Sequence, residues 1–492
     1  MDKDLATAGF SAEDRIQYRQ KVRRCLDALA MMLDADVFES RDGMTGLEIE
    51  MNLIDAAARP AMRNSEVLAG LADPSFQSEL GQFNLELNAS PRSITGNGFA
   101  AYERDLLDSL RRVADRAAKA DCNIVLIGML PTLAPGHLVL ANLSANSRYR
   151  LLNDEMVGAR GEQFPLDIHG VERLVCASDS IVPEAACTSV QFHLQVPPDR
   201  FARFWNASQA IAGIQVAVGA NAPYLHGRRL WAETRIALFE QATDIRPDEL
   251  RAQGVRPRVW FGERWITSVF DLFEENVRYF SPLLPIIQDD DPVQVLRAGG
   301  TPRLDELRLH NGTVYRWNRP VYDVANGRPH FRVENRVLPS GPTVIDLLAN
   351  AAFYFGLTRQ LADEERPVWS RLPFAAAEEN FHAGARHGIE ATVFWPSTGE
   401  IAVTELVRTV LLPKACDGLD TFGVEPALRD RLLGVIDDRC RLARNGATWQ
   451  IESVRLAEQN RGLTRTAALH DMLLRYWALQ QTNEPLHTWP TN

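Results

Sequence analysis

Side chains of the kinds that bind metals and phosphates alternate with apolar side chains in four segments of this 492-residue sequence. The segments are residues 46–52, 82–88, 188–196 and 330–339. Because successive side chains of a strand point to opposite faces, each segment is predicted to be a strand with one apolar face and one face of potential ligands. These potential ligands are Glu48, Glu50, Asn52, Gln82, Asn84, Glu86, Asn88, Gln191, His193, Gln195, His330, Arg332, Glu334 and Arg336.

The spacing of the carboxylates suits hard metal ions. Glu48 and Glu50 stand two residues apart, so in a strand their Cα atoms lie about 6 to 7 Å apart and both could hold Mg²⁺. Several carboxylates on one face raise one another's pKa values unless something positive lies among them. Divalent metals that carry a nucleoside triphosphate meet this need, and Arg332 and Arg336 are suited to bidentate contact with its phosphates.

Each segment taken alone could also be an ordinary strand whose polar face meets water. The four segments contain no lysine, and their Glu, Gln, Asn, His and Arg residues favour ligand binding over simple solubility. Glu79 lies seven residues before Glu86, an odd offset that requires a bend at Gly81 if both are to share a face. His193 fits either a metal ligand or a buried structural histidine, and Arg332 could instead form a salt bridge with a neighbouring glutamate.

The rest of the sequence mixes helical and strand patterns. Helical spacing with a capping signal predicts a helix over residues 11–35, a second helix is predicted over 102–119, and a short buried strand follows at 122–128. Helical spacing dominates from about residue 367 onward. We therefore predict an α+β fold with a largely antiparallel sheet and helices on its apolar side. The predicted division is a catalytic core with an N-terminal helix at residues 1–360 and a helical C-terminal region at 361–492, packed on the core.

Composition and charge exclude several classes of function. The formal charge is −11, from 53 Lys and Arg against 64 Asp and Glu, and no basic run predicts a nucleic-acid partner. The beginning of the chain does not resemble a secretory signal, and the longest apolar runs, residues 124–130 and 211–218, are too short to cross a membrane. Six scattered cysteines without a Cys-x-x-Cys motif are predicted to be reduced. We expect a cytoplasmic protein that does not bind membranes.

The order of several short motifs between residues 40 and 360 resembles the glutamate–cysteine ligase family of the plant and bacterial type, together with the related carboxylate–amine ligases. The motifs are Gly46–Glu50, Glu79–Leu87, Asn146–Leu152, Cys187–Leu194, Gly219–Gly227 with the following Thr234 and Arg235, and Arg332–Arg336. The resemblance implies a catalytic core like those of glutamine synthetase and the guanidino kinases, with ATP and Mg²⁺ as cofactors and Mn²⁺ as a possible substitute. It also implies a place in glutathione biosynthesis.

The resemblance, together with the strand pattern, gives each site residue an expected role. The expected metal ligands are Glu48, Glu50, Glu79, Glu86, His193 and Glu334. The expected ATP contacts are Gln191, His193, Arg332 and Arg336. The expected substrate contacts are Arg148, Tyr149 and Arg235. The expected catalytic residues are Glu50 and Arg336.

The expected reaction is ATP-dependent formation of an amide between the carboxylate of glutamate, or a similar donor, and an amine such as cysteine, through an acyl phosphate. The sequence has no Gly-x-Ser-x-Gly elbow, no Gly-x-x-x-x-Gly-Lys-Ser/Thr loop and no Gly-x-Gly-x-x-Gly fingerprint, which is consistent with nucleotide binding on an antiparallel sheet. Ala-Asn-Ala-Pro at residues 220–223 departs from the family's usual Ala-Asn-Ser-Pro near the substrate. The alternatives are a phosphotransferase on the same fold and a non-catalytic nucleotide-binding regulator.

Overall fold

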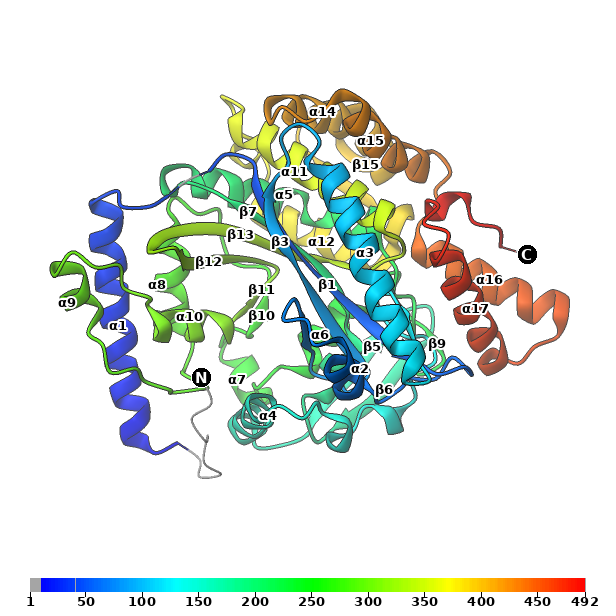
Figure 1. Cartoon of the computed structure of the whole chain (residues 1–492), viewed down its shortest axis with the longest axis horizontal. Helices are drawn as coiled ribbons and strands as arrows, with labels where there is room; N and C mark the ends of the chain where they lie inside the picture. The colour runs from blue at the N-terminus through cyan, green and yellow to red at the C-terminus, as the bar shows by residue number, and fades with distance from the viewer. Residues whose placement is uncertain (1–9, 40, 492) are drawn as a thin grey trace.

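An antiparallel sheet forms the centre of the protein (Figure 1). The computed structural model describes residues 10–39 and 41–491, and within them the sheet has seven strands, six of which lie in the order β12-β13-β7-β1-β3-β2 while β4 pairs with β1. All pairings in it are antiparallel. Its strands are β1 (Met44–Ile54), β2 (Phe76–Ser78), β3 (Asn84–Ser93), β4 (Asn123–Val125), β7 (Ser189–Gln195), β12 (Asn318–Ala325) and β13 (Arg328–Pro339).

The four predicted ligand-bearing strands are therefore confirmed as β1, β3, β7 and β13. The second one begins at Asn84 rather than at Gln82, because Gln82 lies in the turn after β2 and its side-chain amide donates to the carbonyl oxygens of Ala141 and Leu143, 3.0 Å away in each case. The strand predicted at 122–128 is shorter than expected, since only Asn123–Val125 pairs with β1.

Helices cover the apolar face of the sheet. These are α3 (Gly98–Lys119), α5 (Pro198–Gly219) and α11 (Val344–Asp363), which share one continuous core with the sheet. Leu47, Ile49 and Met51 of β1 are at most 1% exposed, as the alternation predicts. From β7, the Phe192 ring lies 6.0 Å from that of Tyr354 on α11. Most polar side chains of the same strands therefore lie on the other face, while Asn335 of β13 is paired with Gln215 of α5 on the helix-covered face.

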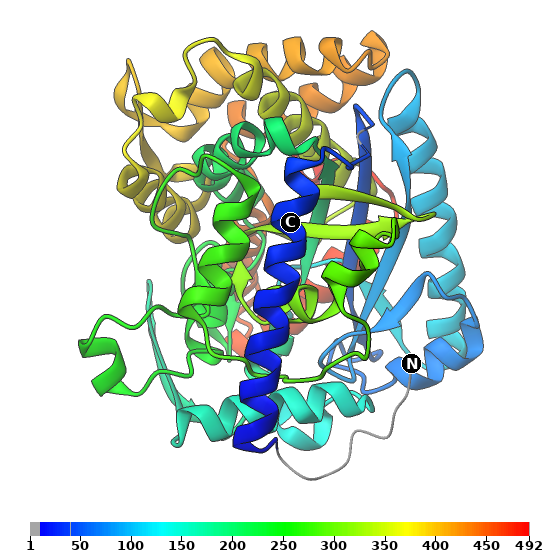
Figure 2. The ribbon, with the colours of Figure 1, turned by 90° about the vertical axis from the view of Figure 1, so that its left-hand side faces the viewer.

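A second group of helices packs near the β12 edge of the sheet. It consists of α1 (Ala12–Asp34), α8 (Val269–Tyr279), α9 (Pro292–Arg297) and α10 (Asp305–Gly312), and Figure 2 shows α1 on the outside of this group. The predicted N-terminal helix is confirmed: Ser11 accepts from the backbone N–H of Asp14 and the Asp14 carboxylate accepts from that of Ser11. Tyr18 fixes α1 to α10 through a buried hydrogen bond to the carbonyl oxygen of Glu306.

The C-terminal part of the chain is largely helical, as predicted. Its helices are α12 (Phe374–His387), α13 (Val403–Leu406), α14 (Leu412–Thr421), α15 (Pro426–Arg441), α16 (Gly446–Arg461) and α17 (Arg465–Gln480), interrupted by a hairpin of β14 (Thr392–Trp395) and β15 (Gly399–Ala402). Helix α14 approaches α11 so closely that a Cβ on Gly418 would lie 1.9 Å from the carbonyl oxygen of Gly356. Residue 360 falls within α11, and residues from both sides of it share one core; the division into 1–360 and 361–492 stays a prediction.

The remaining elements lie at the ends and on the polar side of the sheet. They are α2 (Asn64–Leu71), α4 (Ser147–Arg160), α6 (Thr234–Ala242), α7 (Asp248–Ala252), β5 (Phe164–His169), β6 (Arg173–Ser178), β8 (Tyr224–Leu225), β9 (Arg228–Arg229), β10 (Val259–Trp260) and β11 (Tyr315–Arg316). Among the described helices, none has both the length and the hydrophobicity to cross a bilayer. The cytoplasmic location and the lack of nucleic-acid partners stay predictions.

Candidate active site

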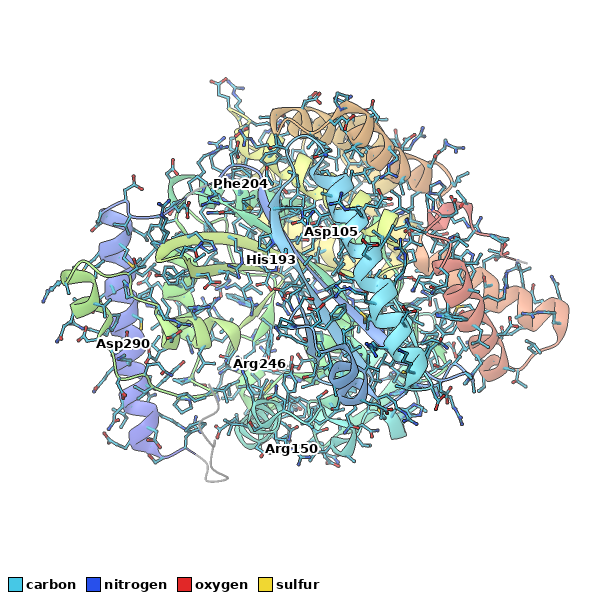
Figure 3. All side chains as sticks on the ribbon, viewed as in Figure 1. Asp105, Arg150, His193, Phe204, Arg246 and Asp290 are labelled. Carbon is cyan, nitrogen blue, oxygen red and sulfur yellow. The ribbon has the colours of Figure 1, made fainter. Side chains whose placement is uncertain are left out.

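The polar face of the sheet forms a groove lined by side chains that include those of β1, β3, β7 and β13. Figure 3 labels one residue of this face, His193 of β7, near the middle of the protein. The strand register explains the convergence, because Glu50 pairs with Glu86 across β1 and β3, and Glu48 pairs with Gln191 across β1 and β7. Directly opposed side chains on one face have Cβ atoms about 4.5 to 5.5 Å apart. The main cavity of this groove has a volume of about 860 Å³.

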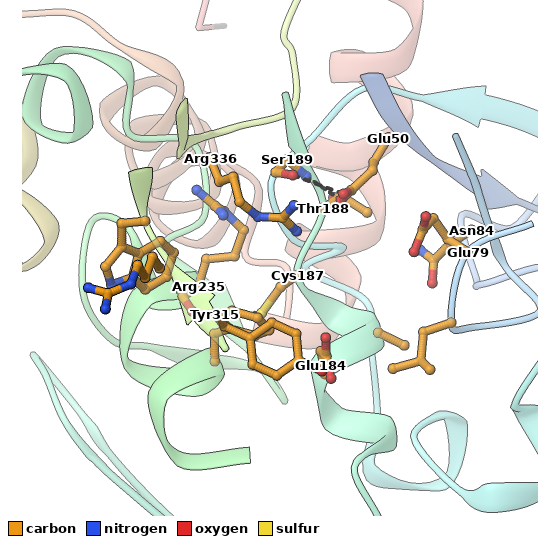
Figure 4. Close-up of a pocket in the computed structure, with 15 residues that line it drawn as sticks. Glu50, Glu79, Asn84, Glu184, Cys187, Thr188, Ser189, Arg235, Tyr315 and Arg336 are labelled. Carbon is orange, nitrogen blue, oxygen red and sulfur yellow. Dashed lines mark hydrogen bonds between the residues drawn. The ribbon is translucent and has the colours of Figure 1, made fainter. Parts of the chain in front are cut away.

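Glu50 and Arg336 are joined through one glutamine. The Glu50 carboxylate accepts from the backbone N–H of Ser189 at 2.6 Å and from the Ser189 hydroxyl at 2.9 Å, as Figure 4 shows. The Gln191 side chain donates to Glu50 at 3.1 Å and accepts from the Arg336 guanidinium at 2.8 Å. Burial raises the pKa of Glu50 in spite of the nearby Arg336 charge. Glu50 is thus held in one orientation by three donors.

Glu334 lies between two arginines. Arg319 on β12 donates to both oxygens of the Glu334 carboxylate, at 2.6 and 2.9 Å, and Arg336 donates to one of them. Burial alone would raise the pKa of Glu334, but the two guanidinium charges lower it well below its ordinary value. The carboxylate is therefore ionised and orients Arg336 toward the groove.

A candidate metal cluster lies beside this ion pair. Glu48, His193 and Glu334 offer ligand atoms that all lie within 4.8 Å of one another. The His193 Nε2 atom is 3.1 Å from a Glu48 oxygen, and His193 Nδ1 accepts from the Arg332 Nε at 3.1 Å. Burial raises the pKa of Glu48, but the adjacent His193 outweighs burial and lowers it. His193 therefore lies among ligand groups rather than in an apolar core.

Arg332 lies away from Arg336. It donates to Asp323 at 3.2 Å and lines a separate cavity of about 610 Å³ with Glu48 and His193. The salt bridge considered for Arg332 therefore exists, with an aspartate as partner. Arg332 also faces an open cavity, so the structure leaves its predicted ATP contact untested.

Glu79 and Glu86 reach the same groove because the chain bends between them. Strand β2 ends at Ser78, and in the turn before β3 the backbone N–H of Asn84 donates to the carbonyl oxygen of Gly81 at 2.9 Å. A Cβ on Gly81 would lie 2.5 Å from the Asn84 side chain, so the turn needs glycine. The predicted bend at Gly81 is confirmed.

Burial and mutual repulsion outweigh the nearby positive charge of Arg336 at these two carboxyl groups. Burial, with the neighbouring carboxylates Glu48 and Glu50, raises the pKa of Glu86 to about 8. Burial and the charge of Glu86 raise the pKa of Glu79 well above its ordinary value. Glu184, a residue that the sequence analysis did not select, also has its pKa raised by burial to about 8. Binding of a cation would therefore stabilise the ionised forms of these carboxyl groups.

The predicted substrate residues lie at two places around the groove. Arg148 and Tyr149 are on α4 at its rim, where Arg148 is exposed and the Tyr149 hydroxyl donates to the carbonyl oxygen of Ser78 at 2.8 Å. Arg235 is buried at the start of α6, where it donates to Glu233 at 2.9 Å and to the carbonyl oxygen of Val337 at 2.8 Å. Arg235 lines a small pocket beside the groove, whereas Arg148 and Tyr149 line the groove itself.

The C-terminal helices help to position Arg235. Glu233, its ion-pair partner, accepts from the backbone N–H of Asn221 at 2.9 Å. The Asn221 side chain donates to the Tyr476 hydroxyl on α17 at 2.9 Å and accepts from Gln450 on α16 at 2.8 Å. All five side chains are at most 3% exposed. A continuous buried network therefore connects the C-terminal helices to the small pocket.

Several groups at the site were not selected from the sequence. They are Ser189, Glu184, Tyr315 and Arg319. Arg319 had only a partial signal, because Pro320, Tyr322 and Val324 form an apolar face of β12 but Val321 shares the face of Arg319. Glu184 had none, since it lies in a short 3₁₀ helix, Val182–Ala186, where no strand periodicity marks a ligand.

Comparisons with known proteins agree with this architecture. Residues 44–447 match the sequence model of glutamate-cysteine ligase family 2. Among solved structures, the chain is similar to a glutamate–cysteine ligase from Francisella tularensis in complex with AMP, with 13% identity and a TM-score of 0.53 over 92% of this chain and 96% of that one. It also matches a bifunctional glutathione synthetase from Pasteurella multocida at 12% identity and a TM-score of 0.49, over 93% of this chain and 55% of that one. No curated protein sequence gives a significant match.

Proposed function

This chain belongs to glutamate-cysteine ligase family 2 and is a carbon–nitrogen ligase of that kind, and from this membership we propose its reaction. ATP phosphorylates a carboxylate of glutamate, or of a similar donor, to give an acyl phosphate. An amine such as cysteine then attacks the acyl carbon, a C–N bond forms, the C–O bond to phosphate breaks, and phosphate leaves. The amine nitrogen gives up its surplus protons to phosphate and solvent.

The observation that carries this proposal is the convergence of Glu48, Glu50, Glu79 and Glu86 on one face of the groove, beside Arg336. The pKa values of three of them are raised, which means that their ionised forms lack sufficient positive charge nearby. A bound cation would supply that charge. Oxygen ligands are those that Mg²⁺ prefers, and the carboxylate and imidazole set of Glu48, His193 and Glu334 would also suit Mn²⁺. The residues present therefore fit a divalent metal with a nucleotide.

Each residue then has a distinct task. The carboxylates and His193 would hold the metal, which neutralises phosphate charge during transfer. Arg336, oriented by Glu334 and Gln191, would contact the transferring phosphoryl group. Gln191 keeps Glu50 and Arg336 in register by bonding to both. Arg148, Tyr149 and Arg235 are proposed substrate contacts, and Arg332 is a proposed contact to the nucleotide.

The proposal is tested by ADP release in the presence of ATP and Mg²⁺, with glutamate and a panel of amines added singly and in pairs. We expect release only when glutamate and one amine are both present, with one amide formed for each ADP. Release of ADP with a phosphorylated acceptor and no amide would instead indicate a phosphotransferase. Nucleotide binding without any release would indicate a regulatory protein.

Metal binding has an expected signature in thermal stability. Because the pKa of Glu86 is raised from 4.5 to about 8, the folded protein holds a proton that the unfolded chain releases, and this contribution to stability is lost as pH rises toward 8. Mg²⁺ must displace that proton, so it binds more tightly at higher pH. We expect the rise in Tm on adding Mg²⁺ to be larger near pH 8 than near pH 6.

Differential scanning calorimetry at both pH values measures this difference, with Glu86→Gln as the matched variant. The variant carries no proton for Mg²⁺ to displace at this position, so the pH dependence of its Mg²⁺ shift should be smaller. Equal Mg²⁺ shifts at the two pH values in the native protein would contradict the metal assignment of Glu86.

Removing the Tyr476 hydroxyl tests the network behind Arg235. Tyr476→Phe leaves the Asn221 amide without one of its acceptors, which should lower the free energy of unfolding by about 1 to 3 kcal/mol. Because Asn221 and Glu233 hold Arg235, we also expect KM for the donor amino acid to rise several-fold while kcat changes less. Urea unfolding and steady-state kinetics measure the two effects. Tyr279→Phe, at a ring that is 47% exposed, is the control, and an unchanged KM in Tyr476→Phe would remove the positioning role.

A further inference from the structure

A small pocket opens beside the catalytic groove and shares part of its wall. Its volume is about 80 Å³, and Glu50, Glu79 and Arg336 line both it and the groove. Its other walls include the aromatic side chains Phe239, Tyr315 and Trp317. One end of a small ligand could therefore lie in this pocket while its other end reaches the reacting groups.

A guanidinium and a buried carboxyl group lie within this pocket. Arg235 lines it and keeps its guanidinium fixed by bonds to Glu233 and to the backbone of Val337. Glu184 lines it as well, and Figure 4 shows Glu184, Cys187 and Tyr315 on the side opposite Arg336 and Glu50. Together they match the carboxylate and ammonium groups that an amino acid carries on one carbon, because a bound ammonium group favours ionisation of the Glu184 carboxyl group.

Glu184 differs from the other acidic groups of the site in having an oxygen that is both fully buried and without a hydrogen-bond partner in the described part of the chain. This oxygen is its Oε2 atom. Glu50 and Glu334, by contrast, each accept several bonds. A buried carboxylate oxygen without a donor is costly, so its presence indicates that a donor is supplied by a ligand.

We propose that Glu184 binds the α-ammonium group of the donor amino acid, whose α-carboxylate contacts Arg235 and whose second carboxylate extends to Arg336 for phosphorylation. This inference rests on the proposed function and narrows its donor to an amino dicarboxylate. A dicarboxylate of the same length without nitrogen would leave Glu184 buried and unpaired. Glu184 is thus a residue that selects for the amino group.

The expected discrimination is large, because a site that hydrogen-bonds a polar group rejects an analogue lacking it. Rejection of this type reaches about 10⁴ to 10⁵ in kcat/KM in favourable cases. For the native protein we expect a preference for glutamate over glutarate of at least about 10²-fold. In Glu184→Gln, which keeps the shape and loses the charge, we expect the preference to fall to about tenfold or less.

Hydroxylamine provides a readout that does not depend on the amine substrate. With ATP and Mg²⁺ it traps an acyl phosphate as a hydroxamate, so glutamate and glutarate can be compared as donors alone. The proteins are the native chain, Glu184→Gln, and Glu249→Gln as a control at an exposed glutamate on α7. Circular dichroism and thermal melting establish that all three are folded.

An unchanged preference for glutamate over glutarate in Glu184→Gln would overturn the inference. So would a change in the Mg²⁺ requirement with that preference intact, since this would place Glu184 among the metal ligands. If the native protein forms no hydroxamate with either donor, the proposed function fails instead. Calorimetric titration with glutamate and with glutarate then still tests the role of Glu184. Equal glutamate affinities of the native and Glu184→Gln proteins would exclude an ammonium contact by Glu184.

Discussion

We expect the substitution Arg336→Met to lower kcat by at least about 10³-fold. Losses of this size follow when a charge that stabilises a transferring phosphoryl group is removed. The guanidinium of Arg336 is held by Glu334 and by Gln191, so its position is fixed before substrate binds. Its charge acts on the phosphoryl group at the moment of transfer, when negative charge spreads over the equatorial oxygens. Binding of the nucleotide should weaken far less than kcat.

The fold should survive this substitution. Glu334 keeps both bonds from Arg319, so its carboxylate is not left unpaired when Arg336 is lost. Stopped-time assays of ADP release give kcat, and far-ultraviolet circular dichroism checks the fold. Arg328→Met is the control, because the Arg328 side chain is 68% exposed and its one ion pair among the described residues is with Glu39. A folded Arg336→Met variant with kcat within tenfold of the native value would contradict the assignment.

We expect the substitution Glu50→Gln to lower Mg²⁺-dependent turnover by at least about 10²-fold. Loss of a residue that only orients a metal ligand costs up to about this much, so loss of a ligand itself should cost at least as much. Glutamine preserves the shape of the side chain and can still accept from the backbone N–H of Ser189. It removes the negative charge that a divalent metal needs. The loss should therefore be in activity rather than in folding.

A titration of activity against Mg²⁺ concentration measures this effect. Glu452→Gln on α16 is the matched control, at a side chain that is 41% exposed and paired with Arg455. Full activity of Glu50→Gln at the same Mg²⁺ concentration would exclude Glu50 as a metal ligand. Partial recovery at higher Mg²⁺ would be consistent with one lost ligand among several.

The catalytic face was predictable because alternation acts within each strand. Glu48 and Glu50 share a face with period two, and their apolar neighbours mark the opposite face as core. The bend at Gly81 followed from the parity of Glu79 and Glu86. The helix after Ser11 was predictable from its capping residues, which act over three positions of the same chain.

Contacts between strands were not predictable in the same way. The order of β13, β7, β1 and β3, and hence the meeting of His193 with Glu334, depends on pairing between distant segments. The pairing of β13 with β7 shifts its register between Asn335 and Leu338, next to Arg336. No sequence pattern predicts this shift. Glu184 reaches the pocket from a 3₁₀ helix, so only the folded chain places it beside Arg235.

The C-terminal region shows the same limit. Its helices were predicted from apolar spacing, but the hairpin of β14 and β15 within them was not, because each strand has only four residues. The link from Tyr476 to Arg235 passes through Asn221 and Glu233, and Tyr476 lies 255 residues from Asn221 in the sequence. Such a network depends on tertiary packing, which a local pattern does not encode.

Transfer of ¹⁸O from the donor carboxylate to inorganic phosphate tests the acyl phosphate most directly. Glutamate labelled in its side-chain carboxylate is incubated with ATP, Mg²⁺ and the amine that supports ADP release, and the phosphate is analysed by mass spectrometry. An acyl phosphate leaves its bridging oxygen on phosphate when the amine attacks the acyl carbon, so we predict one ¹⁸O in each phosphate for each amide formed. Amide formation with unlabelled phosphate, or labelled glutamate recovered without any amide, would contradict the proposed reaction.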